Sequence, residues 1–187
     1  MLVTRRDAAA VFGGAGFAAL LAIAAKPARA DTKAEIDAAV GAAVQRLRGM
    51  ENAAKLMDAS VAQLIFPRIL SGGFILGGQY GEGALLRGGR TVGYYRIAGA
   101  SLGLLAGAQT AGLAMIIMKE DALAALRQND GWEIGTGPSV VAFDLGAQAN
   151  FTTTTLNEPV YAITFNQQGL MAALSINGSR ITPITPS

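Results

Sequence analysis

The chain has 187 residues, of which 51% are hydrophobic and 15% charged, and this composition supports one folded domain rather than a disordered chain. It contains no cysteine and no histidine, which excludes disulfides, zinc sites of the usual Cys/His kind, cysteine nucleophiles and Ser-His-Asp triads. The net charge is +2, but several of the 15 basic residues lie near the N-terminus, and the remaining charges nearly balance. A nearly neutral remainder predicts no nucleic-acid partner.

The first 30 residues have the layout of a signal peptide. Arg5-Arg6 precedes an apolar stretch at 8–25, and Ala28-Arg29-Ala30 is a small-x-small cleavage site. Paired arginines before a mildly hydrophobic stretch are typical of twin-arginine export. We therefore expect cleavage after Ala30, a periplasmic or secreted protein, and a single domain over residues 31–187. An uncleaved N-terminal anchor helix is the alternative.

Two helices are predicted next. From Thr32 to about Leu47, apolar residues recur at helical spacing, and Asp31 or Thr32 can cap the start. A second helix is predicted from Glu51 to about Leu64, where apolar residues again share one face. It is expected to end near Pro67, because proline cannot continue a helix.

After Pro67, apolar runs interrupted by glycines replace the helical period. They predict strands at 69–78, 83–87 and 90–97, with Gly88-Gly89 as a two-residue hairpin loop. The loop places Arg87 opposite Arg90, a like-charge pair that costs stability unless something anionic lies between them.

Residues 97–118 carry no charge, and glycines recur in them at four-residue spacing. This pattern is compatible with a transmembrane helix that has a GxxxG packing face. It is equally compatible with two buried strands that meet near Gln109-Thr110. Periodicity does not separate the two interpretations, and we favour the strands because of the resemblance described below.

The rest of the chain predicts one more helix and further strands. The helix covers 119–129, with acidic residues in its first turn and Arg127 in its last, as the helix dipole favours. Strands are predicted at 138–145, 160–165 and 170–176, with Asn177-Gly178 as a turn and a loose tail after Ile181. The predicted fold class is α+β, with N-terminal helices packed on a curved, mostly antiparallel, barrel-like sheet.

The glycine-rich run from Ile69 to Leu86 and the segment from Ser101 to Gln109 resemble the core of the SYLF domain. Similar stretches follow in the same order at 115–118, 134–141 and 168–179, so the resemblance covers about Glu51 to Ile181. SYLF domains are lipid-binding modules, and bacterial members are commonly exported. The resemblance therefore implies an exported, non-catalytic protein that binds membrane phospholipid.

Two properties of eukaryotic SYLF proteins, phosphoinositide binding and actin association, do not carry over to this sequence. Many members have a basic residue just before the glycine of the penultimate turn, whereas this chain has Asn166-Gln167-Gln168-Gly169. Recognition of a highly charged inositol phosphate is therefore not predicted, and actin is not expected as a partner in a bacterial periplasm. The alternative function is a structural protein of the cell envelope that binds a protein partner or itself.

Basic residues are the candidate ligands for a lipid phosphate, because arginine forks match phosphate oxygens. The candidates lie on the predicted hairpin and around the break between the two N-terminal helices: Arg87, Arg90 and Arg96, and Arg46, Arg48 and Lys55. An amphipathic helix flanked by cations can lie on a membrane surface. The alternatives are a solvated hairpin tip and an ordinary core-packing helix with a solvated face.

No other motif points to chemistry. The run Gly78 to Gly83 has neither the spacing nor the following helix of a nucleotide-binding loop, and its glycines indicate close strand packing instead. Glu120-Asp121 is explained by its place at a helix N-terminus. Glu82, near Tyr80 among glycines, is the one carboxylate with unusual surroundings, but it lacks a partner acid or base. We therefore expect no enzymatic activity, no cofactor, no bound nucleotide and no metal.

Overall fold

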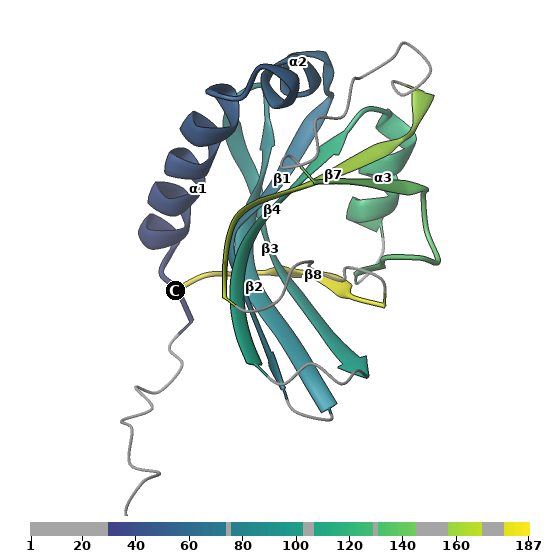
Figure 1. Ribbon diagram of the computed structural model, residues 1–187. Helices are drawn as coiled ribbons and strands as arrows, with labels where there is room; N and C mark the ends of the chain where they lie inside the picture. Colours follow the sequence, from purple (N-terminus) through teal and green to yellow (C-terminus); the bar gives the residue numbers. More distant parts are fainter. Residues whose placement is uncertain (1–29, 74–75, 103–106, 129–130, 145–156, 170–177) are drawn as a thin grey trace, which may run out of the picture. The chain divides into compact units, whose positions relative to one another are not determined.

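The computed structural model describes residues 30–73, 76–102, 107–128, 131–144, 157–169 and 178–187 (Figure 1). The elements in chain order are α1 (Lys33–Arg48), α2 (Glu51–Ala59), β1 (Ala62–Gly73), β2 (Leu76–Arg87), β3 (Arg90–Leu102), β4 (Gly107–Ile117), α3 (Glu120–Gln128), β5 (Trp132–Glu133), β6 (Val140–Asp144), β7 (Val160–Gly169) and β8 (Arg180–Ile184). This arrangement of helices and sheet confirms the predicted α+β class.

The eight strands form one sheet in the order β5-β8-β3-β2-β1-β4-β7-β6. Neighbouring strands run antiparallel except β6 and β7, which are parallel. The sheet is strongly curled, as predicted (Figure 1). Within the described residues, β5 and β6 are the two edges of the sheet and do not pair with each other. The curled sheet is therefore open, in the form of a half-barrel.

Helix α1 begins with a capping box and packs on the sheet. The Thr32 hydroxyl accepts a hydrogen bond from the Glu35 amide at 3.3 Å, and the Glu35 carboxylate accepts one from the Thr32 amide at 2.7 Å. The predicted cap at Thr32 is therefore confirmed. The buried face of α1 includes Ile36, Val40 and Leu47, and it packs against β1 and β2.

The sheet is buried on both faces by two separate hydrophobic cores. Along β1, Leu64 and Phe66 point into the core that contains α3, whereas Ile65 between them points into the core under α1 and α2. Figure 1 shows these helices on opposite sides of the strands. Double-sided burial explains the continuous apolar runs at 64–66 in β1 and 113–117 in β4, where successive residues enter opposite cores.

The predicted second helix is too long by about one turn. Helix α2 ends at Ala59, and Gln63 donates a side-chain hydrogen bond to the Met57 carbonyl at 3.1 Å, which satisfies an acceptor at the helix end. Pro67, predicted as the residue that stops the helix, lies inside β1. The strand accommodates it at a register shift between Phe66 and Ile69, where a missing amide donor is tolerated.

The uncharged segment 97–118 forms strands, as favoured, but the break lies elsewhere than predicted. Gln109 and Thr110 are inside β4, and the connection from β3 falls at 103–106, outside the described residues. The strand predicted at 69–78 is likewise divided between β1 and β2. In both cases a connection interrupts an apolar, glycine-rich run that has no charged residue to mark it. Among the described helices, none has the length and hydropathy needed to cross a membrane.

The predicted loose tail after Ile181 is wrong. Residues 180–184 form β8, which pairs with β3 and with β5, and the Ile181 side chain is fully buried. The Lys33 amide also donates to the Ser187 carbonyl at 3.2 Å, which fixes the last residue beside the start of α1. The strand predicted at 170–176 and Asn177 of the predicted turn lie outside the described residues, while Gly178 has the positive φ of 73° that a turn requires.

Tyr94 on β3 fastens α1 to the sheet and gives a prediction on pH dependence. Its hydroxyl donates to Asp37 at 2.8 Å, and burial together with this hydrogen bond raises the pKa of Tyr94 to about 12. Because tyrosine ordinarily titrates near pH 10, we expect the stabilisation to be complete below about pH 10 and to be lost as the pH rises through 12. An ultraviolet titration of tyrosinate should show that Tyr94→Phe removes the latest of the resolved ionisations. An unchanged curve would contradict the assignment.

Candidate functional site

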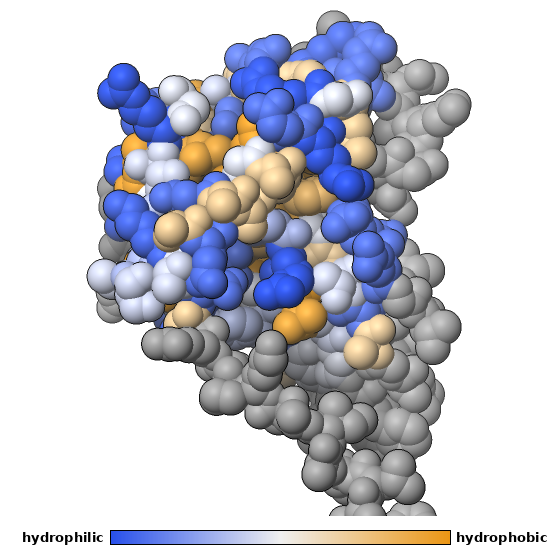
Figure 2. Space-filling model, turned by 90° about the vertical axis from the view of Figure 1, so that its left-hand side faces the viewer, coloured by the Kyte–Doolittle hydropathy of each residue, from blue (hydrophilic) through white to orange (hydrophobic). Residues whose placement is uncertain are grey.

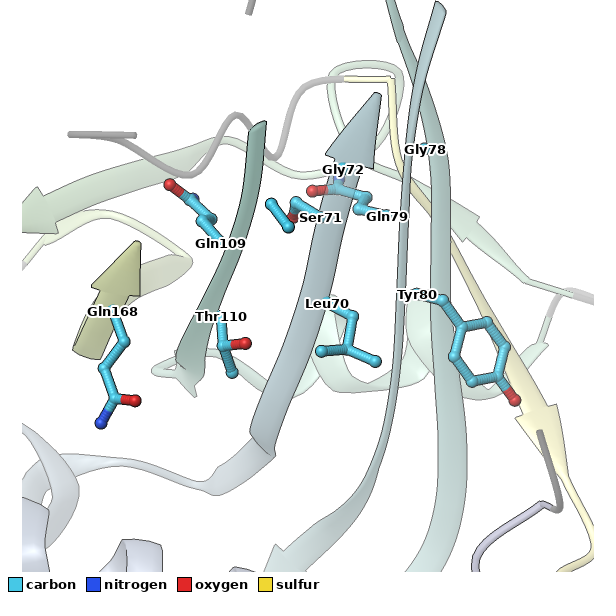
Figure 3. Close-up of a pocket in the computed structure, with 10 residues that line it drawn as sticks. Leu70, Ser71, Gly72, Gly78, Gln79, Tyr80, Gln109, Thr110 and Gln168 are labelled. Atoms are coloured by element: carbon cyan, nitrogen blue, oxygen red, sulfur yellow. The ribbon is translucent and has the colours of Figure 1, made fainter. Parts of the chain in front are cut away.

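Four neighbouring strands form an open hollow of about 660 Å³ lined only by strand residues. At its centre Leu70 on β1 pairs with Tyr80 on β2 and with Thr110 on β4, and Thr110 pairs with Gln168 on β7 (Figure 3). We call this surface the apolar hollow. Its lining residues are Leu70, Ser71, Gly72, Gly78, Gln79, Tyr80, Ala108, Gln109, Thr110 and Gln168.

The apolar hollow exposes large hydrophobic side chains side by side. Leu70 is 53% exposed and Tyr80 is 43% exposed, and the two are directly opposite each other in adjacent strands. In the described part of the chain, the other large hydrophobic residue with comparable exposure is Val92, at 42%. Small residues continue the surface next to Leu70 and Tyr80, because Gly72 pairs with Gly78 and with Ala108. Clustered exposure of this kind makes the apolar hollow a candidate contact surface for an apolar ligand.

A row of charged residues crosses the sheet one repeat of the pleat away from Leu70 and Tyr80. Arg68 on β1 pairs with Glu82 on β2, and Glu82 pairs with Arg96 on β3. Alternate residues of a strand share a face, so this row lies beside the apolar hollow on the same side of the sheet. Arg68 and Arg96 are exposed, and Glu82 is partly buried between them.

Hydrogen bonds hold Glu82 at both carboxylate oxygens. The Tyr80 hydroxyl donates to Oε1, and the Asp31 amide donates to Oε2 at 3.1 Å. Burial first, and then the hydrogen bond to Glu82, raise the pKa of Tyr80. Through its hydrogen bond to Glu82, Tyr80 joins the charged row to the apolar hollow.

A second hollow, of about 590 Å³, lies between α1 and this part of the sheet. Its charged lining residues are Asp31, Glu35, Arg46, Arg68 and Glu82, and we call it the charged hollow. Figure 2 shows this side of the molecule, where hydrophilic side chains surround smaller apolar patches. Of the six predicted basic residues, the structure thus brings Arg46 and Arg96 to the neighbourhood of the apolar hollow.

The hairpin tip has the predicted form, and an acidic residue of the chain lies beside one of its two arginines. Gly88 and Gly89 have φ values of 57° and 76°, and Arg87 pairs with Arg90 across the turn. Arg87 forms an ion pair with Glu120 at the start of α3. Arg90 is exposed at the tip.

The basic residues around the break between α1 and α2 are partly neutralised by acidic neighbours. Arg48 pairs with Asp58 at 3.1 Å, and Lys55 pairs with Glu51 at 2.7 Å. Such exposed ion pairs are weak, about 0 to 1 kcal/mol, so they lower the local charge without fixing the side chains. Arg48 lies near the hairpin tip, because Arg48 and the tip residues Gly88 and Gly89 line the same groove.

Sequence reasoning missed Arg68 and Leu70. Their strand was predicted to begin only at residue 69, and the register shift between Phe66 and Ile69 determines which side chains face α1. The available signal was the contrast between a single arginine and the apolar run around it. In the described ranges, no group of three or more acidic residues is placed to hold a metal ion.

The fold and the two hollows define a small α+β domain that presents an amphiphilic surface on one side of a curled sheet. Residues 98–185 match the family model of Ysc84, described as a Las17-binding protein actin regulator. This match confirms the predicted resemblance to the SYLF family over residues 98–185. The match begins in β3, so the resemblance of residues 51–97 stays a prediction. A search of curated proteins finds no match.

Proposed function

We propose that this protein is an exported, non-catalytic module that binds membrane phospholipid through the apolar hollow and the arginines beside it. The observation that carries the proposal is the adjacency of two exposed apolar side chains, Leu70 and Tyr80, to Arg68 and Arg96. This arrangement suits a phospholipid, whose acyl chains and phosphate are joined in one molecule. The lipid-binding character implied by the SYLF resemblance supports the same conclusion.

The charge of the row favours a lipid with one phosphate. Glu82 lies between Arg68 and Arg96, so these three side chains together carry a single net positive charge. Two guanidinium groups can still offer forked donors to phosphate oxygens on either side of the carboxylate. A diester phosphate with one negative charge balances this row, whereas a polyphosphorylated inositol does not.

Co-sedimentation with vesicles tests the proposal. The chain is expected to pellet with vesicles of phosphatidylcholine mixed with phosphatidylglycerol and to bind phosphatidylcholine alone more weakly. Salt should release part of the bound protein, because ions screen the interaction of arginine with phosphate. Absence from the pellet with both vesicle types would contradict the proposal, and self-association in that case would favour the structural alternative.

Matched substitutions locate the binding surface. Leu70→Ser is expected to weaken vesicle binding about 10-fold, because a buried leucine contributes roughly 1.5 to 3 kcal/mol when it leaves water. Val92→Ser is the control, since Val92 is comparably exposed but lies outside the apolar hollow. Equal losses in the two variants would show that the hollow is not the contact surface.

The arginines are compared in the same way. The double variant Arg68→Gln with Arg96→Gln should lose about 10-fold or more in binding to anionic vesicles, since each basic residue at the surface contributes roughly 1 kcal/mol. Arg90→Gln is the control for general charge, because Arg90 is equally basic and lies at the hairpin tip. A larger loss with Arg90→Gln would move the head-group site to the predicted hairpin.

A further inference from the structure

The backbone nitrogen of Asp31 lies 3.1 Å from Oε2 of Glu82. Asp31 is also the residue that follows the predicted cleavage site, Ala28-Arg29-Ala30. In the uncleaved chain this nitrogen is a neutral amide with one hydrogen to donate. Cleavage after Ala30 converts the same atom into an α-amino group, which is a cation at neutral pH because its ordinary pKa is about 8.

The position of the Asp31 nitrogen is set by structure on the residues that follow it. Thr32 is held by the capping box with Glu35 at the start of α1. The Lys33 amide is bonded to the carbonyl of Ser187 at 3.2 Å. Two consecutive residues are therefore fixed, so the nitrogen of Asp31 reaches Glu82 without ordering a long flexible segment.

The position and partial burial of the Glu82 carboxylate suit it to pair with a cation. Its other oxygen accepts a hydrogen bond from Tyr80, and Glu82 is partly buried, so a charge beside it is less screened than at an open surface. The other charged groups around this point are the Asp31 side chain itself, Arg68 and Arg96 in the adjacent strands, and Glu35 and Arg46 on α1. Acidic and basic groups are nearly balanced there. The close contact with Glu82 therefore decides that the pKa of an α-amino group at this position is raised.

We infer that cleavage after Ala30 creates an ion pair between the new α-amino group of Asp31 and Glu82, so that Glu82 seats the mature N-terminus. This inference rests on the processing step of the proposed function. Removal of the signal peptide then strengthens the contact that fastens the start of α1 to β2. The same carboxylate accepts the hydrogen bond of Tyr80 at the edge of the apolar hollow, so the ion pair also supports that contact.

Three forms of the chain test the inference: one that starts at Asp31, one that starts at Ala30, and the Asp31 form with Glu82→Gln. The Ala30 form is a matched control, because it also has an α-amino group but places it one residue away. An NMR titration of the α-amino group should give a pKa raised by about 1 unit in the Asp31 form, and an ordinary pKa in the other two.

Thermal unfolding is the second readout. At neutral pH the Asp31 form is expected to melt about 2 to 4 °C above the Ala30 form, and Glu82→Gln should remove the difference. A raised pKa means that the stabilisation is complete below about pH 8 and is lost as the pH rises through the raised value, so the two forms should converge in alkali.

The inference is overturned by an ordinary α-amino pKa in the Asp31 form, by a shift that persists in Glu82→Gln, or by an exported protein whose mass shows a different first residue. Vesicle co-sedimentation of the same samples separates this result from the proposed function. A raised α-amino pKa without vesicle binding would support the ion pair with Glu82 and contradict the proposed phospholipid binding. Vesicle binding without a raised α-amino pKa would support phospholipid binding and contradict the ion pair.

Discussion

Replacing Gly83 by alanine is expected to destabilise the protein by about 3 kcal/mol, with a matching fall in the urea midpoint. A Cβ atom at this position would lie 2.1 Å from the carbonyl oxygen of Ile65 and 2.8 Å from the ring of Phe66. The oxygen belongs to the backbone of β1, which is paired on both sides, with β2 and β4. The strands must therefore separate locally to admit the methyl group.

Gly41→Ala on α1 is the control for this substitution. A Cβ at Gly41 meets nothing within 4 Å, and alanine is favoured over glycine in a helix by about 0.5 to 1 kcal/mol, so this variant should be more stable than the wild type. A Gly83→Ala variant that unfolds at the wild-type midpoint would show that β1 and β2 do not approach as closely as described.

Local signals made much of this fold predictable from sequence. The close approach at Gly83 follows from the interpretation that glycines in the run Gly78 to Gly83 permit tight strand packing. The cap at Thr32, the turn at Gly88-Gly89 and the helix at 119–129 were also recognisable, because each depends on residues near one another in the chain. These features need no knowledge of which strands pair.

Features that depend on distant pairing could not be predicted. Strand β8 is held by β3, and no local pattern after Ile181 indicates that partner. The register shift around Pro67 results from the pairing of β1 with two other strands. In a sheet buried on both faces, an apolar run also does not reveal where burial ends, so the exposure of Leu70 was not foreseeable.

The candidate site shows the same division. The pairing of Arg87 with Arg90 was predicted from a two-residue turn, but the anion that neutralises Arg87 is Glu120, which is 33 residues away. Arg96 was placed on the correct strand, yet its row with Glu82 and Arg68 requires the order of three strands. The sequence supplied candidate basic residues, and the order of the strands decided which of them lie side by side.

The second large effect is expected at Phe66, on the same strand as Leu70 and only four residues before it. Phe66 is fully buried in the core that also contains Trp132, so Phe66→Ala should cost about 3 to 5 kcal/mol of unfolding free energy. Urea unfolding followed by tryptophan fluorescence suits this measurement, because Trp132 is the one tryptophan in the chain and is buried in the same core.

Leu70→Ala is the matched control for Phe66→Ala, because it also shortens a large apolar side chain of β1. Leu70 is 53% exposed, so its loss should change the free energy of unfolding by only about 0.5 kcal/mol. A protein that keeps its stability but loses vesicle binding in Leu70→Ala would assign Leu70 to a contact outside the fold. Equal destabilisation by the two substitutions would instead place Leu70 in a core, and the apolar hollow would not be available to a lipid.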